Sequence, residues 1–142
     1  MARALSLIVR HDSAVVDTDV VSFLFKNDSR AQLYLPLLRN RKLLVSLMTE
    51  AELEQWILLA KWGAVRVQRF QAFMTGFASV PSSRDLILRW ADVMVAARAN
   101  GRRIESADAW IAATALLYGA ALITHNPKDY SGVPRLNVLS CA

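Results

Sequence analysis

A helix followed directly by a buried strand, over residues 106–124, limits the possible folds of this chain more than any other feature of the sequence. Ser106 is predicted to cap the helix at its start, and Gly119 is predicted to end it. Residues 121–124, Ala-Leu-Ile-Thr, then form a short apolar strand that leads into an Asn-Pro turn. Such units, repeated along a chain, build a parallel sheet covered by helices.

Asp108 falls in the first turn of this helix, at the start of its apolar face. The residues three, four and seven positions further on are Ile111, Ala112 and Ala115. These side chains are small enough for the helix to lie close against a sheet, with Asp108 at the end of the buried face. An acid in a first turn also stabilises the helix dipole. This stretch alone leaves both roles for Asp108 open.

Short apolar strands alternate with helices along the rest of the chain. The sequence therefore predicts a three-layer α/β/α sandwich with a short, mainly parallel central sheet. Thr18 or Asp19 is predicted to cap the first helix, and Gly63 to break the longest one. The other strands are predicted at residues 14–17, 43–46, 77–80 and 136–139, and the other helices at residues 20–25, 30–39, 48–62, 64–73 and 86–99.

Length and composition favour one ordered domain. With 142 residues, 54% of them apolar, the chain can bury a core without disulfides or a structural metal. Residues 1–13 are predicted to form an N-terminal arm and residues 14–142 the domain. Cys141 is the single cysteine, which excludes a cysteine-based zinc site and favours a cytoplasmic location. No apolar run reaches the roughly 18 residues that span a membrane, and the net charge of +5 favours anionic partners such as nucleic acid.

Three aspartates are predicted to lie at the edge where the parallel strands end. Asp17 follows the first strand, Asp108 begins its helix, and Asp129 follows the strand at residues 121–124. Sites in such sheets form at the carboxyl ends of the strands. We therefore expect these acids to lie near one another.

A fourth acid comes from the helix predicted at residues 48–62, whose three glutamates do not share a face. Glu50 and Glu54 are four residues apart and share a face with Lys61, so we expect them to be solvated. Glu52 lies about 200° away on the helix. Its expected neighbours on that apolar face are Met48, Trp56 and Leu59. A carboxylate there is costly unless it is paired or bound to a cation, which favours a site residue over an edge residue that reaches solvent.

Carboxylates from separate segments, without a histidine or cysteine cluster, suit a hard cation such as Mg²⁺ or Mn²⁺. His11 lies in the predicted arm, and His125 is a single loop imidazole. The chain has no Walker loop, no GxGxxG and no GxSxG, so the sequence gives no sign of a nucleotide-binding loop or a serine nucleophile.

Four short motifs, taken together, resemble the PIN-domain ribonucleases, and most closely the VapC toxins of bacterial toxin–antitoxin pairs. They are Val-Asp-Thr-Asp at residues 16–19, Ser-Leu-Met-Thr-Glu-Ala-Glu-Leu at 46–53, Ser-Ala-Asp-Ala-Trp-Ile-Ala-Ala-Thr-Ala at 106–115 and Thr-His-Asn-Pro-Lys-Asp-Tyr at 124–130. Each motif alone has little specificity, but the four occur in the family's order. The resemblance covers nearly the whole chain from about Ala14.

The resemblance implies a PIN-like fold and an endoribonuclease that depends on Mg²⁺ or Mn²⁺ and hydrolyses RNA phosphodiesters, in tRNA or rRNA. The family's acids fall on Asp17, Glu52, Asp108 and Asp129. Residues that match the family's accompanying polar groups, and would line the substrate, are Thr18, Thr124 and Asn126. A bound metal would activate a water and offset charge in the transition state.

The resemblance also implies a cognate antitoxin and a second subunit as partners. Apolar, aromatic-bearing segments at residues 33–38 and 56–77 exceed what one small core needs, so they are expected at interfaces, with core packing as the alternative. Basic residues that either steer RNA or form a solvated surface are Arg39, Arg41, Lys42, Arg66, Arg69, Arg98, Arg102 and Arg103.

Two other functions fit parts of the sequence. A catalytically silent PIN-like RNA-binding domain would not need the intact set of acids. A phosphoacceptor signalling domain, also a parallel α/β fold, needs an adjacent acidic pair after the first strand and a lysine near the last strand. Asp17-Thr18-Asp19 fits the first requirement imperfectly, and no lysine lies near residues 136–139.

Overall fold

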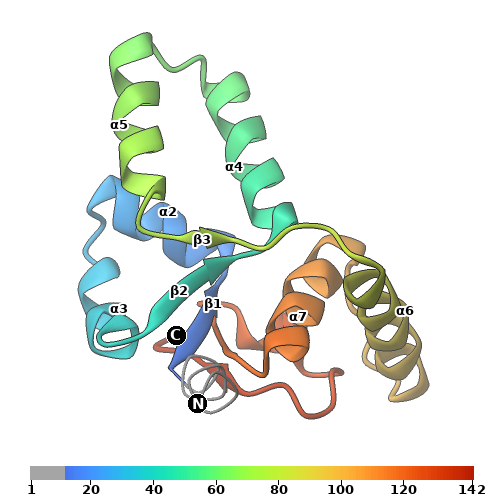
Figure 1. The fold of residues 1–142 in the computed structure, drawn as a ribbon. Helices are drawn as coiled ribbons and strands as arrows, with labels where there is room; N and C mark the ends of the chain where they lie inside the picture. Colours follow the sequence, from blue (N-terminus) through green and yellow to red (C-terminus); the bar gives the residue numbers. More distant parts are fainter. Residues whose placement is uncertain (1–11) are drawn as a thin grey trace, which may run out of the picture.

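A five-stranded parallel sheet forms the centre of the molecule, with the strands in the order β3-β2-β1-β4-β5 (Figure 1). The structure, a computed structural model, describes residues 12–142. The predicted arm at residues 1–13, with His11, therefore lies outside the described residues except for Asp12 and Ser13. The strands are β1 (Ser13–Val16), β2 (Lys42–Val45), β3 (Ala78–Ser79), β4 (Ala121–Ile123) and β5 (Val138–Leu139).

Helices connect the strands, as βα units require. Among the described residues, none of the helices is both long and apolar enough to span a bilayer. The helices are α2 (Thr18–Lys26), α3 (Ala31–Leu38), α4 (Leu47–Ala60), α5 (Ala64–Met74), α6 (Arg84–Ala99) and α7 (Ser106–Tyr118), followed by the 3₁₀ turn η1 (Pro127–Tyr130).

The sheet separates two hydrophobic clusters, because successive residues of a strand point to opposite faces. On β4, Leu122 packs toward α6 and α7, and the next residue, Ile123, packs toward α2, α3, α4 and α5. On β1, Val15 and Val16 divide in the same way. The predicted three-layer α/β/α sandwich with a parallel sheet is thus confirmed.

On the α6–α7 face, small side chains allow close packing. Ile111, Ala112 and Ala115 of α7 are fully buried, as the spacing after Asp108 predicts, and Ala109 and Ala113 are buried as well. Trp90 of α6 stacks on Trp110 of α7 with ring centroids 5.1 Å apart. Its Nε1 also donates to the backbone oxygen of Ser106 at 3.2 Å. The first turn of α7 is therefore held against α6.

On the opposite face, α4 and α5 form a helical hairpin that projects beyond the sheet (Figure 1). Helix α4 buries Thr49, Leu53 and Ile57. Of the face predicted to carry Met48, Trp56 and Leu59, the first two are partly buried and pack against the core, but Leu59 is 75% exposed, so its inclusion was wrong. Large aromatic rings fill the space between the hairpin and α2: Phe25, Trp56, Trp62, Phe70 and Phe73.

Three helix boundaries differ from the prediction. Asp17, not Thr18 or Asp19, caps α2, because its Oδ1 accepts from the backbone N of Thr18 at 2.7 Å. Helix α7 begins at Ser106 with Glu105 as the cap residue, since the Glu105 oxygen already accepts from the backbone N of Ala109. Helix α4 ends at Ala60, and its C-cap residue is Lys61, whose backbone is left-handed at φ 52°, two residues before Gly63.

Candidate active site

The carboxyl ends of β1 and β4 form the centre of the candidate site. β1 is the middle strand, with β2 on one side and β4 on the other. The chain runs outward from β1 to β2 and β3 and then returns to the other side of β1 to form β4 and β5. The strand order therefore reverses between β1 and β4, and the crevice at such a switch point is where α/β sheets place ligands. Asp17 follows β1, and Thr124 follows β4. We name the acids gathered here, Asp17, Glu52, Asp108 and Asp129, the acid edge.

Asp17 is the most enclosed acid of this group, with 7% of its surface exposed. Its Oδ2 accepts from Thr124 Oγ1 at 2.7 Å and from Tyr130 OH at 2.9 Å. Burial, reinforced by the charge of Asp19, raises the pKa of Asp17 to about 6, although these hydrogen bonds lower it. The carboxylate is therefore fixed in position at a free-energy cost, since burial disfavours its charged form.

Asp108 reaches the same place from the first turn of α7. Its Oδ1 lies 3.5 Å from Tyr130 OH, so one tyrosine hydroxyl contacts two acids. Partial burial raises the pKa of Asp108 to about 6, and the charges of Asp17, Asp129 and Glu52 contribute to this rise. These three charges act on Asp108 together, so the fold brings the four predicted acids into one electrostatic environment.

Glu52 enters from the second turn of α4. Its Oε1 accepts from Thr18 Oγ1 at 2.9 Å, and the same hydroxyl lies 3.0 Å from Thr49 Oγ1. Burial and the charge of Asp17 raise the pKa of Glu52, and the bond from Thr18 lowers it. Glu50 points elsewhere, where its Oε1 accepts from Ser79 Oγ at 2.6 Å. Glu50 is partly exposed and Glu54 is exposed, so neither belongs to the acid edge.

The remaining predicted residues lie at the turn after β4. Asp129 is exposed on η1 and acts on Asp108 through its charge. Asn126 does not contact the four predicted acids by a hydrogen bond among those found in the described residues. Its Nδ2 instead donates to Asp19 Oδ2 at 2.8 Å, and the backbone N of His125 donates to the same oxygen at 3.1 Å.

Asp19 and Tyr130 also lie in the candidate site, although the sequence did not single them out. Asp19 raises the pKa of Asp17 by its charge, and burial raises the pKa of Asp19 itself. Tyr130 is 2% exposed, and burial together with the charges of Asp17 and Asp108 raises the pKa of its hydroxyl, which stays protonated. Asp19 is visible in the sequence as the second acid of Asp-Thr-Asp. Tyr130 is visible there only as an aromatic residue after Asp129.

The acid edge has the composition of a site for a hard cation. All of its donors are oxygens, and the one ion pair among the described residues joins Arg30 to Asp28, so no basic side chain there neutralises Asp17, Glu52 or Asp108. Within that part of the chain, no three acidic, histidine or cysteine side chains already converge as a complete ligand set. Mg²⁺ needs only one or two carboxylates and keeps several waters, so the open arrangement fits Mg²⁺ or Mn²⁺.

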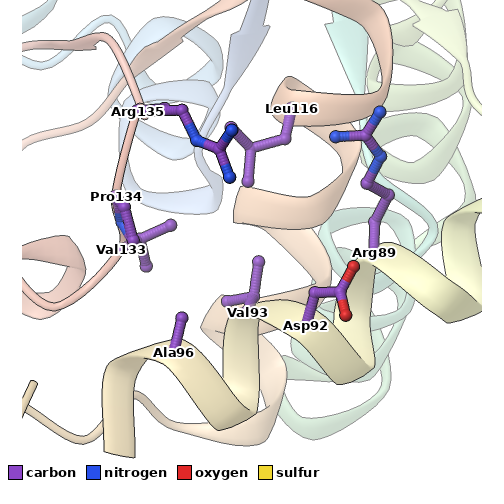
Figure 2. A pocket seen from close by; sticks show the side chains of 8 residues that line it. All are labelled: Arg89, Asp92, Val93, Ala96, Leu116, Val133, Pro134 and Arg135. Carbon is purple, nitrogen blue, oxygen red and sulfur yellow. The ribbon is translucent and has the colours of Figure 1, made fainter. Parts of the chain in front are cut away.

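A hollow of about 370 Å³ adjoins the acids and is lined in part by Thr18, Asp19 and Glu52. A different hollow, of about 200 Å³, lies between α6, α7 and the loop after η1 (Figure 2). Leu116 at its wall is two turns of α7 beyond Asp108, so this second hollow is separate from the acid edge. Figure 2 shows Arg89 and Arg135 beside it.

The chain is similar to known proteins along most of its length. The family model of the PIN domain matches residues 14–136. The protein named ribonuclease VapC1 from Haemophilus influenzae (strain R2866) is 28% identical over 134 residues, which cover 86% of this chain and 92% of that protein.

Solved structures have the same fold. VapBC-1 from nontypeable Haemophilus influenzae superposes with a TM-score of 0.75 at 26% identity, covering 89% of this chain and 96% of that chain. VapBC2 from Rickettsia felis, bound to a DNA fragment from their promoter, gives a TM-score of 0.79 at 20% identity, covering 91% and 98%. The second likeness supports the fold alone.

Proposed function

This chain belongs to the PIN-domain family, and from this premise we propose that it is a Mg²⁺- or Mn²⁺-dependent endoribonuclease that acts as the toxin of a toxin–antitoxin pair. The observation that carries the proposal is the shared environment of Asp17 and Asp108, which arrive from β1 and α7 and whose neighbouring negative charges favour a bound cation. The relatives named ribonuclease VapC supply the reaction class.

We assign the cation to Asp17 and Asp108, with Glu52 and Asp129 completing the acid edge. When bound, the metal lowers the pKa of a water and offsets negative charge on the phosphodiester. Thr124 and Tyr130 hold Asp17 by donating to one of its oxygens.

Glu52 is the proposed base. Its Oε1 is engaged by Thr18, while among the described residues its Oε2 has no hydrogen-bond donor. That oxygen is thus available to accept a proton from the attacking water.

The proposed substrate is RNA, such as tRNA or rRNA, because the chain carries a net charge of +5 and its named relatives are ribonucleases. The proposed partner is a cognate antitoxin, since the similar chains come from VapBC structures. Leu58, Leu59 and Val65 are more than two-thirds exposed at the end of the α4–α5 hairpin and supply an apolar surface for a protein partner or a second subunit. A cytoplasmic location goes with these proposals.

Replacement of Asp108 by Asn tests the proposed activity. Asp108→Asn keeps the shape of the side chain and removes a charge, so cleavage of a bulk tRNA pool in Mn²⁺ should fall by more than about 100-fold. The melting temperature without metal should not fall, because the substitution also relieves repulsion with Asp17. Asp92→Asn, an exposed aspartate of α6, is the matched control and should retain full cleavage.

Two outcomes separate the alternatives. A wild-type protein that binds RNA without cleaving it, at any Mg²⁺ or Mn²⁺ concentration, would be a silent RNA-binding domain. An active protein whose expression leaves bacterial growth unchanged would be a ribonuclease with a role other than a toxin. For the toxin, growth should slow on expression and recover when the neighbouring small gene is coexpressed.

A further inference from the structure

A basic hollow with aromatic walls lies between the end of α2 and α5. It has a volume of about 430 Å³, within the usual range for ligand sites. Its lining consists of three cationic and two aromatic side chains and contains no acid. These residues, which we name the basic hollow, are Lys26, Arg66, Arg69, Phe25 and Phe73.

The cations of the basic hollow have no carboxylate partner among the described residues, where Arg30–Asp28 is the one ion pair. Two of them instead lie over indole rings. Lys26 Nζ is 4.6 Å from the centre of the Trp56 ring, and the Arg66 guanidinium carbon is 4.1 Å from that of Trp62. These contacts fix the direction of the cations without neutralising them.

The aromatic rings form a continuous packed base for the hollow. Phe25 stacks on Trp62 at 5.4 Å between centroids and lies 5.4 Å from Phe73. Trp62 in turn meets Trp56 edge to face at 4.7 Å. The hollow therefore has walls that are held in place by the core.

Lys26 connects this hollow to the proposed active site. The same lysine, with Trp56, lines the hollow that contains Thr18 and Glu52. The two hollows therefore share Lys26. One of them is also lined by Arg66 and Arg69, and the other by Glu52 of the acid edge. An RNA strand with its scissile phosphate at the acids would extend past Lys26 toward the two arginines.

We propose that the basic hollow is a subsite for single-stranded RNA that flanks the scissile phosphate, an inference that rests on the proposed nuclease function. Lys26 and Arg69 would bind phosphates, and the plane of Arg66 stacked on Trp62 would support an unpaired base. The three cations of the basic hollow make an apolar protein segment a poor occupant. The exposed apolar side chains of the hairpin are instead Leu58, Leu59 and Val65.

The test is binding of a fluorescent single-stranded oligoribonucleotide of about ten residues to the full chain in EDTA, where metal-dependent cleavage is stopped. Arg66→Glu/Arg69→Glu should weaken binding by at least about tenfold at moderate salt. It should also reduce the slope of log Kd against log salt by about 0.7 for each phosphate that the variant no longer binds. The matched control is Arg39→Glu/Lys42→Glu, which makes the same change in charge. Arg39 follows α3 and Lys42 begins β2, at the opposite end of the strand from the acids, so this variant should weaken RNA binding less.

A second measurement does not depend on the folding of a variant. Oligoribonucleotides that carry 5-bromouridine should crosslink to peptides containing Trp56, Trp62 or Phe73 in the wild-type protein. Crosslinks confined to other faces would overturn the proposal. So would equal RNA binding by the two double variants.

Three further outcomes distinguish failure of the subsite from failure of the proposed function. If the wild type neither binds nor cleaves RNA, the proposed function fails and the subsite fails with it. If the wild type cleaves and Arg66→Glu/Arg69→Glu keeps the same KM, the subsite is wrong and the nuclease stands. If that variant binds RNA normally but no longer captures the coexpressed product of the neighbouring gene, the hollow binds protein, and the RNA proposal is overturned.

Discussion

The two helices that bring Asp108 and Glu52 to the acid edge are packed in opposite ways. Helix α7 is enclosed along most of its length by the sheet and α6, and it buries Ala109, Ile111, Ala112, Ala113, Thr114 and Ala115. Helix α4 buries one narrow stripe of Thr49, Leu53 and Ile57, and its last turn exposes Leu58 and Leu59. One acid is therefore held by the core, and the other is held by a helix that continues outward into a hairpin.

This difference separates two requirements of the proposed site. The acids need fixed positions, because a small displacement of a charged group changes the reaction geometry. On α7, small alanine side chains let the helix pack closely against the sheet, which fixes the position of Asp108. A partner or substrate needs accessible surface, and the α4–α5 hairpin provides it without disturbing Glu52, which lies in the second turn of α4.

The largest expected effect distinguishes two glutamates on α4. Glu52→Gln should reduce RNA cleavage at saturating Mn²⁺ by about 100- to 1,000-fold, since the substitution removes a charge from the acid edge. Glu50→Gln should change cleavage by less than about twofold, because Glu50 bonds Ser79 away from the acids. If Glu50→Gln is the inactive variant, the orientation assigned to α4 does not represent the working enzyme.

Two leucines test how α4 is anchored. Leu53 is 2% exposed, so Leu53→Ala should lower the free energy of unfolding by about 2–5 kcal/mol. Leu59→Ala, at 75% exposure, should change it by less than about 0.5 kcal/mol. Urea denaturation of both variants gives the comparison. Equal losses would mean that the outer part of α4 is buried in solution.

Gly132, in the loop after η1, should tolerate no larger side chain. A Cβ at Gly132 would lie 2.1 Å from the backbone oxygen of Arg102, so Gly132→Ala should cost about 1–3 kcal/mol and lower the melting temperature by several degrees. Gly76, after α5, is the matched control, because a Cβ there meets only the Phe73 oxygen at 3.5 Å. Gly76→Ala should leave stability nearly unchanged. A reversed order would show that the hairpin side is the tightly packed one.

The smallest effect is a dependence of stability on pH. The pKa of Asp17 and that of Asp108 are each raised from 3.8 to about 6, so between about pH 4 and pH 6 the folded state keeps protons that the unfolded chain has lost. The free energy of unfolding should therefore fall as pH rises through this window, by about 1–2 kcal/mol after allowance for the partial exposure of Asp108.

Denaturation in urea across this pH range, without divalent metal, measures the effect. Asp17→Asn should show a flatter curve than the wild type, and the difference between the two isolates the acid edge from the other carboxyl groups. Added Mg²⁺ at pH 7 should restore stability to the wild type more than to the variant. The raised pKa values would be contradicted if, between about pH 4 and pH 6, the free energy of unfolding of the wild type rose relative to that of Asp17→Asn.

The sequence alone determined the elements and their order. Helical spacing after Asp108 marked a buried face, and Gly119 ended α7 in the left-handed conformation that glycine favours, at φ 60°. Alternation of strands and helices required parallel strands, whose carboxyl ends meet at one edge. For that reason the sequence was sufficient to group Asp17, Asp108 and Asp129. Glu52 joined them through its place on an apolar helix face and through the resemblance to the family, and the catalytic roles of all four stay predictions.

Only the tertiary structure decided which side chains complete the site and which face of α4 is buried. Tyr130 meets Asp17 across 113 positions of sequence, and Asn126 meets Asp19 across 107. Periodicity specifies which residues of one helix share a face, but not which other element covers that face. The pKa of a carboxyl and the cost of burying it depend on those neighbours, so they follow from strand order and packing and not from local sequence.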